Sequence, residues 1–135
     1  MKRRTFSVMA VALLVLVLSG CVGAGVPVPE FDRAQVSADA LPNSEAFDST
    51  PYSAESSRFI AEQSGWEIFI ARTTGDENTR KNCLLLFNGS SNLAQCDDAL
   101  PLSIRPDGET FTISLAGPQG PKDSKSISDS VYITN

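Results

Sequence analysis

The sequence predicts a mainly β protein: a small antiparallel meander or half-barrel of five to six strands with one disulfide, preceded by a signal peptide and a flexible tether. Three observations support this fold class. Short apolar stretches after residue 57 alternate with polar residues at the two-residue period of a strand. Gly, Pro, Asn and Asp separate these stretches at turn positions. Two cysteines, Cys83 and Cys96, lie in this region and are available to form a bridge.

The first 20 residues have the composition of a lipoprotein signal peptide. Residues 2–4 are Lys-Arg-Arg, and residues 8–18 form an uncharged apolar stretch that is shorter than the roughly 20 residues of a membrane-spanning helix. Residues 18–21, Leu-Ser-Gly-Cys, then resemble a bacterial lipobox. In that motif the thiol of Cys21 accepts a diacylglycerol, and cleavage leaves Cys21 as the acylated first residue. An ordinary secretory cleavage site or an uncleaved anchor is the alternative, and would make Cys21 incidental.

Cleavage at this site would make the chain more acidic. The full chain of 135 residues has 11 basic and 16 acidic side chains and a formal net charge of −5. Cleavage removes three basic residues and no acidic ones, which leaves a net charge of −8. Anionic headgroups repel such a body, so acyl chains, not a basic patch, would hold it on the extracytoplasmic face of the cell membrane.

Residues 21–56 are predicted to be the acylated cysteine and a flexible tether. The stretch is rich in Pro, Ser, Ala and Asp and shows neither the helical nor the strand period. A coil of this length reaches on the order of 30–40 Å. A short helix around residues 43–47, capped by Asn43 or Ser44, is an alternative for part of it.

The β domain is predicted to span residues 57–135 and to begin with a hairpin. Its strands are residues 57–63 and 66–72, and Ser64-Gly65 between them has the composition of a two-residue turn. Side chains of the second strand alternate between its two faces. We expect Trp66, Ile68 and Ile70 on one face, and Glu67 and Phe69 on the other.

Residues 83–87 (Cys-Leu-Leu-Leu-Phe) are apolar on both faces, which is typical of a central buried strand. Asn88-Gly89 indicates a turn after it. A helix of one or two turns is an open alternative between residues 92 and 100. A strand is expected over residues 100–104, with Pro101 at its start, where a missing N–H does little harm.

Residues 105–108 (Arg-Pro-Asp-Gly) predict a turn before the clearest alternation in the chain. In that strand, Phe111, Ile113 and Leu115 are expected on one face, and Thr110, Thr112 and Ser114 on the other. Residues 117–121 (Gly-Pro-Gln-Gly-Pro) interrupt the strand. A last strand over residues 130–134 would set Val131 and Ile133 against Tyr132.

Cys83 and Cys96 are the two cysteines that remain if Cys21 is acylated, and an even count in an exported protein predicts a disulfide. The chain-entropy model assigns a loop of this length roughly 3 kcal/mol, which a domain this small needs. Free thiols or a metal or redox pair are the alternatives. The pair does not have the Cys-x-x-Cys spacing of redox sites. A zinc site would need two further ligands, and the chain has no His to supply them.

The composition gives little support to catalysis or to nucleic-acid binding. The chain has no His, the commonest general base and metal ligand, and its negative charge opposes phosphate binding. We therefore expect no enzyme activity, cofactor or metal. A Ser–Lys pair among Ser124, Ser126, Lys122 and Lys125 is the main catalytic alternative, but these residues lie in a Gly/Pro/Ser-rich loop.

A candidate ligand or partner surface is formed by Trp66, Phe69 and Arg72 on the second predicted strand. The competing interpretation places Trp66 in the core. Arg72 also belongs, with Arg80, Lys81 and Arg105, to a candidate local positive patch, for which simple solubility is the alternative.

The region from residue 57 to residue 115 resembles the small actinobacterial membrane lipoproteins of unassigned function. The motifs are Ser-Arg-Phe-Ile-Ala-Glu, Trp-Glu-Ile-Phe-Ile-Ala-Arg, Asn-Cys-Leu-Leu-Leu, and a second Cys followed by Leu-Pro-Leu-Ser-Ile. The resemblance implies a surface-anchored domain and supplies no catalytic residues. We expect a non-enzymatic binding or interaction module that contacts an envelope protein. A small-solute-binding or transport accessory is the alternative.

Overall fold

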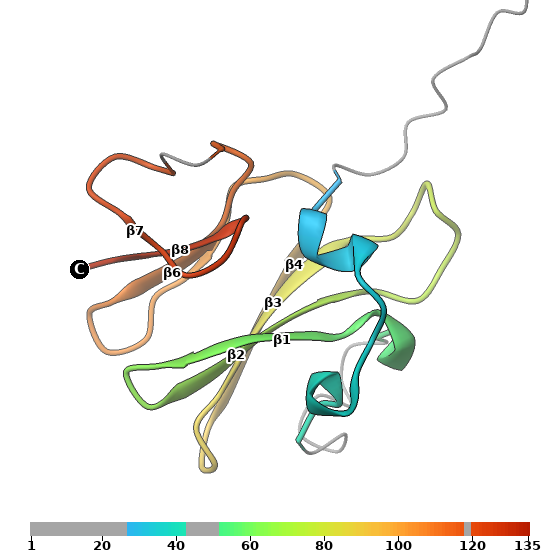
Figure 1. Cartoon of the computed structure of the whole chain (residues 1–135), viewed down its shortest axis with the longest axis horizontal. Coiled ribbons are helices and arrows are strands. Elements are labelled where there is room, and N and C mark those ends of the chain that lie inside the picture. The colour runs from blue at the N-terminus through green and yellow to red at the C-terminus, as the bar shows by residue number, and fades with distance from the viewer. Residues whose placement is uncertain (1–26, 43–51, 118–119) are drawn as a thin grey trace, which may run out of the picture.

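The computed structural model describes residues 27–42, 52–117 and 120–135, and it is mainly β, as predicted. In these residues the strands form two four-stranded antiparallel sheets (Figure 1). The first has the order β1-β2-β3-β4, with β1 (Arg58–Gln63), β2 (Trp66–Arg72), β3 (Asn82–Phe87) and β4 (Asn92–Asp97). The second has the order β5-β6-β8-β7, with β5 (Leu102–Ile104), β6 (Thr110–Ile113), β7 (Lys125–Ser126) and β8 (Val131–Thr134).

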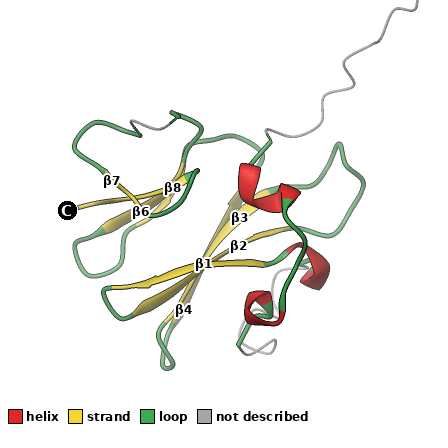
Figure 2. Cartoon of the chain, viewed as in Figure 1, coloured by secondary structure: helices red, strands yellow, loops and turns green. Residues whose placement is uncertain are grey.

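Short 3₁₀ helices precede the first strand (Figure 2). They are η1 (Pro29–Asp32), η2 (Ser37–Asp39) and η4 (Ala54–Ser56). No helix in the described ranges is long and apolar enough to cross a membrane.

The predicted turns are confirmed where the strands meet. Ser64 and Gly65 have φ values of 55° and 79°, as a two-residue hairpin turn with two left-handed residues requires. Asn88 begins the β3–β4 turn, and its side-chain Oδ1 accepts hydrogen bonds from the N–H groups of Ser90 and Ser91. The β5–β6 turn contains Asp107 and Gly108 at φ values of 50° and 94°.

The principal core lies between the two sheets and contains the residues that alternation predicted. It consists of Val28, Trp66, Ile68, Ile70, Leu84, Leu86, Leu102, Phe111, Ile113, Val131 and Ile133. Leu115 was expected to join this face, and that prediction is wrong, because 41% of its surface is exposed. β6 ends at Ile113, and the Ser114 N–H donates to the Ser130 carbonyl, so the alternation does not continue to Leu115.

A second apolar cluster lies on the opposite face of the first sheet. Phe69, Ala71, Cys83 and Leu85 are buried there, with Leu41, Tyr52, Phe59 and Cys96 packed around them. Phe59 and Phe69 meet edge to face, with ring centroids 5.3 Å apart. The first sheet is therefore covered on both faces, which explains why β3 is apolar throughout.

The predicted disulfide is confirmed. Cys83 and Cys96 are opposite each other in the β3–β4 register and are joined by an S–S bond of 2.06 Å. This pairing also corrects the helix considered over residues 92–100, because residues 92–97 form β4 instead. Antiparallel pairing with β3 directs Leu93 toward the principal core and Cys96 toward the second cluster.

The structure differs from the expected tether between residues 27 and 42. This segment packs against the domain: Val28 is 1% exposed in the principal core, and Asp39 is 1% exposed beside β1. The physical reason is a set of specific hydrogen bonds that composition does not reveal. Cys21, and the helix considered around residues 43–47, lie outside the described residues.

Candidate functional site

The surface considered at Trp66, Phe69 and Arg72 is not formed as one patch. Trp66 is 6% exposed in the principal core, and Phe69 is 2% exposed in the second cluster on the opposite face. Alternation along β2 requires this separation. Arg72 is partly exposed, and its guanidinium carbon lies 4.3 Å from the centre of the Phe31 ring in η1. The Arg72 guanidinium thus contacts the N-terminal segment. Burial, followed by repulsion from Arg80, lowers the pKa of Arg72.

The serine and lysine residues of the segment before β8, which includes the two-residue strand β7, form no buried catalytic pair. The Ser124 hydroxyl donates to the Pro121 carbonyl at 2.5 Å, and the Ser126 hydroxyl donates to the Ser128 carbonyl at 2.7 Å. Lys122 and Lys125 are exposed. These hydroxyl groups therefore support the loop itself.

The structure reveals two buried carboxylates that sequence reasoning missed, and the first is Asp39. Arg33 donates to both of its oxygens at 2.6 Å. The backbone N–H groups of Val36 and Phe59 each donate to it at 2.8 Å. The bonds from Arg33, with the two backbone donors, outweigh burial and hold the pKa of Asp39 well below its usual range. Asp39 thereby joins η2 to β1.

The second buried carboxylate is Glu30 in η1. It accepts hydrogen bonds from the hydroxyl and N–H groups of Ser130, at 2.6 and 2.9 Å, and from the Ser128 hydroxyl. Burial opposes ionisation, but the bonds from Ser128 and Ser130 are together stronger and lower the pKa of Glu30. Glu30 therefore holds η1 against the start of β8, although 100 residues separate Glu30 from Ser130.

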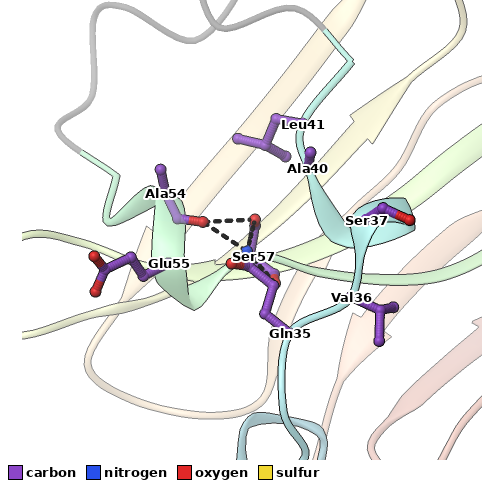
Figure 3. A pocket seen from close by; sticks show the side chains of 8 residues that line it. All are labelled: Gln35, Val36, Ser37, Ala40, Leu41, Ala54, Glu55 and Ser57. Carbon is purple, nitrogen blue, oxygen red and sulfur yellow. Dashed lines mark hydrogen bonds between the residues drawn. The ribbon is translucent and has the colours of Figure 1, made fainter.

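A groove lies between η2 and η4, next to the Asp39 network (Figure 3). Its volume is about 570 Å³. Its lining combines apolar side chains with a few polar ones: Gln35, Val36, Ser37, Ala40, Leu41, Ala54, Glu55 and Ser57. Val36 is 57% exposed, the highest value among the large apolar residues described. The apolar lining of the groove is thus open to solvent at Val36.

Polar groups of the groove hold its two walls at a defined spacing. The Gln35 amide donates to the Ala54 carbonyl at 2.8 Å and to the Ser57 hydroxyl at 3.0 Å. The Ser57 hydroxyl in turn donates to the Asp39 carbonyl at 2.6 Å. Figure 3 shows Gln35 and Ser57 meeting between the two helices. Because Ser57 is 1% exposed and already bonded, it suits support of the walls better than nucleophilic attack.

A second hollow, of about 410 Å³, lies beside the second sheet. Glu109, Asp123 and Lys125 are among its lining residues. Such mixed, solvated charges offer little apolar surface to a ligand, so the groove between η2 and η4 is the better candidate.

No protein-family model, curated protein or solved structure matches the chain.

Proposed function

We propose that the protein is a non-enzymatic binding module, held on the outer face of a bacterial cell membrane by acyl chains on Cys21. The groove between η2 and η4 receives an apolar side chain from an extended segment of an envelope protein. The observation that carries this proposal is the groove itself. Its walls are braced by the bonds of Gln35 and Ser57, and its apolar surface extends to the exposed Val36.

The extent of the apolar surface favours a protein segment. Val36 lines the groove and is 57% exposed, so a segment that continues beyond the groove would cover more of it than a small solute held inside. Glu55 is exposed at the rim, and the mature chain would have a net charge of −8. A partner segment with a basic residue next to its apolar one would complement this charge.

The disulfide supports an extracytoplasmic location, because such bonds persist in oxidising compartments. The lipobox-like residues 18–21 support the membrane anchor. No nucleic-acid partner is proposed, because the acidic chain opposes phosphate binding.

Site-specific photo-crosslinking in the source cells tests the partner. A benzophenone amino acid at position 36 should yield a discrete crosslinked protein. The same amino acid at Leu115, the other large apolar residue exposed in the described regions, is the matched control. Crosslinking that Ala54→Trp abolishes would place the partner in the groove. Equal products from both positions, or none from either, would contradict the proposal.

The alternative is a small-solute-binding accessory, and the groove volume favours it as the second candidate, because about 570 Å³ lies within the range of small-molecule sites. In that case an apolar solute should raise the melting temperature of the wild-type protein and not that of Ala54→Trp. No crosslinked protein would then form at Val36.

A further inference from the structure

The N-terminal segment joins the folded domain much earlier than a tether ending at residue 56 would. Val28 is 1% exposed in the principal core, Glu30 is bonded to Ser128 and Ser130, and Phe31 lies under the Arg72 guanidinium. These three contacts come from different parts of the fold. Together they fix η1 as the point where the chain enters the domain.

The distance between this point and the proposed anchor is therefore short. Seven peptide units separate Cys21 from Val28, and a fully extended chain spans at most about 3.6 Å per residue, or about 25 Å in total. A coil of the same length has a root-mean-square extent of about 15 Å. The 35-residue coil expected from composition would have reached on the order of 30–40 Å.

We propose that the end of the domain that contains η1 and residues 73–81 faces the lipid bilayer. The contacts that fix η1 to the domain set this orientation. The inference rests on the proposed acylation of Cys21 and deepens it by assigning the membrane-facing surface. Arg72, at the end of β2, touches Phe31, so η1 lies beside the base of the 73–81 loop (Figure 1).

The charges of the 73–81 loop cancel within the loop, but not over the whole end of the domain. Asp76 and Glu77 are balanced by Arg80 and Lys81, and all four are exposed. Asp32 in η1 and Asp97, which is opposite Asn82, add exposed carboxylates at the same end. The short link from Cys21 therefore carries the proposed orientation, and charge does not.

The opposite end of the first sheet would point away from the membrane. The strand register places the Ser64–Gly65 and Asn88–Ser91 turns together at that end, because Glu67 is opposite Phe87 whereas Arg72 is opposite Asn82. Five residues along β2 correspond to about 17 Å at 3.3–3.4 Å per residue. Positions in the two end regions are therefore far enough apart to report different depths.

Fluorescence quenching on vesicles tests the orientation. The full acylated protein carries a fluorescent amino acid at either Asn78 or Ser90. The vesicles contain phosphatidylethanolamine, phosphatidylglycerol and a lipid with a nitroxide headgroup. We expect quenching at Asn78 to be several-fold greater than at Ser90. Equal quenching in protein that floats with the vesicles would overturn the orientation while leaving the anchor intact.

Two variants test the role of η1. Insertion of a long Gly-Ser segment between residues 26 and 27 leaves every described contact in place, and it should remove the difference between the two probes. Glu30→Ala should reduce the difference, with the melting curve checked to show that the domain remains folded. A difference that persists after the insertion would show that the short link does not set the orientation. Failure of the acylated protein to float with vesicles would refute the proposed anchor itself.

Discussion

Replacement of Asp39 by Asn should destabilise the domain strongly, although the two side chains have nearly the same size. Asp39 is 1% exposed and accepts four hydrogen bonds, two from Arg33 and one each from the N–H groups of Val36 and Phe59. An amide removes the charge and directs two donors toward a site that contains donors only. The result is at least one buried N–H group without an acceptor.

The magnitude follows from these contacts. Removing one member of a buried ion pair costs about 3–5 kcal/mol, but the Arg33 side chain is 41% exposed and recovers hydration. We therefore expect a loss of about 2–4 kcal/mol in the free energy of unfolding. For a domain of this size, each kcal/mol lowers the melting temperature by about 4–8 °C.

Thermal and urea unfolding of the mature chain measure this loss. Glu62→Gln is the matched control, because Glu62 is an exposed acid on β1, the strand to which Asp39 is bonded, and its replacement by an amide should change stability by less than about 0.5 kcal/mol. Equal effects of the two substitutions would refute the structural role of Asp39.

The pH dependence supplies an independent check. The pKa of Asp39 is lowered on folding, so its contribution is complete above the unfolded value of about 4 and is lost as pH falls through the folded value. The stability difference between the wild type and Asp39→Asn should therefore shrink below about pH 4. A difference that stays constant into this acid range would contradict the assignment.

The remaining predictions concern the disulfide, one glycine and the anchor. Reduction of the disulfide should lower the free energy of unfolding by roughly 3 kcal/mol, which unfolding in the presence and absence of reductant measures; no change would contradict a stabilising bridge. Gly120→Ala should destabilise the protein by more than Gly89→Ala, because both glycines have positive φ but only at position 120 would the new Cβ overlap a side chain, the Tyr132 ring. Equal melting temperatures for these two variants would contradict the close packing at Gly120. Cys21→Ser should release the protein from membranes on fractionation, and retention after signal processing would refute lipid anchoring.

The strands and turns of the domain could be predicted because their signals are local. Alternation at Phe111 and Ile113, and the turn composition at Ser64-Gly65, depend only on neighbouring residues, and both are confirmed. β4 has weaker local signals, since its six residues include only one large aliphatic side chain, Leu93. Its strand conformation depends on pairing with β3, and a local sequence pattern does not predict that pairing.

The groove, the buried carboxylates and the second cluster were harder to predict, because their determinants join distant parts of the chain. Glu30 lies in a Pro-rich segment that resembles a coil, and its partner Ser130 is 100 residues away. The sequence leaves Trp66 and Phe69 as candidate surface residues because a single sequence does not show what covers a strand. The second cluster is completed by Leu41 and Tyr52, which the sequence composition places in the tether.

The Asp39–Arg33 pair also explains how the first sheet ends at β1. An edge strand presents unpaired backbone groups to other chains unless something covers them. Here the Phe59 N–H donates to Asp39 at 2.8 Å, and the Phe59 carbonyl accepts from Arg33 at 3.1 Å. Two charged side chains thus occupy the positions that a further strand would need.

The segment that blocks strand addition at β1 also forms one wall of the groove between η2 and η4. A partner is therefore expected to bind this side of the domain through side chains in the groove, because strand pairing at Phe59 is already blocked.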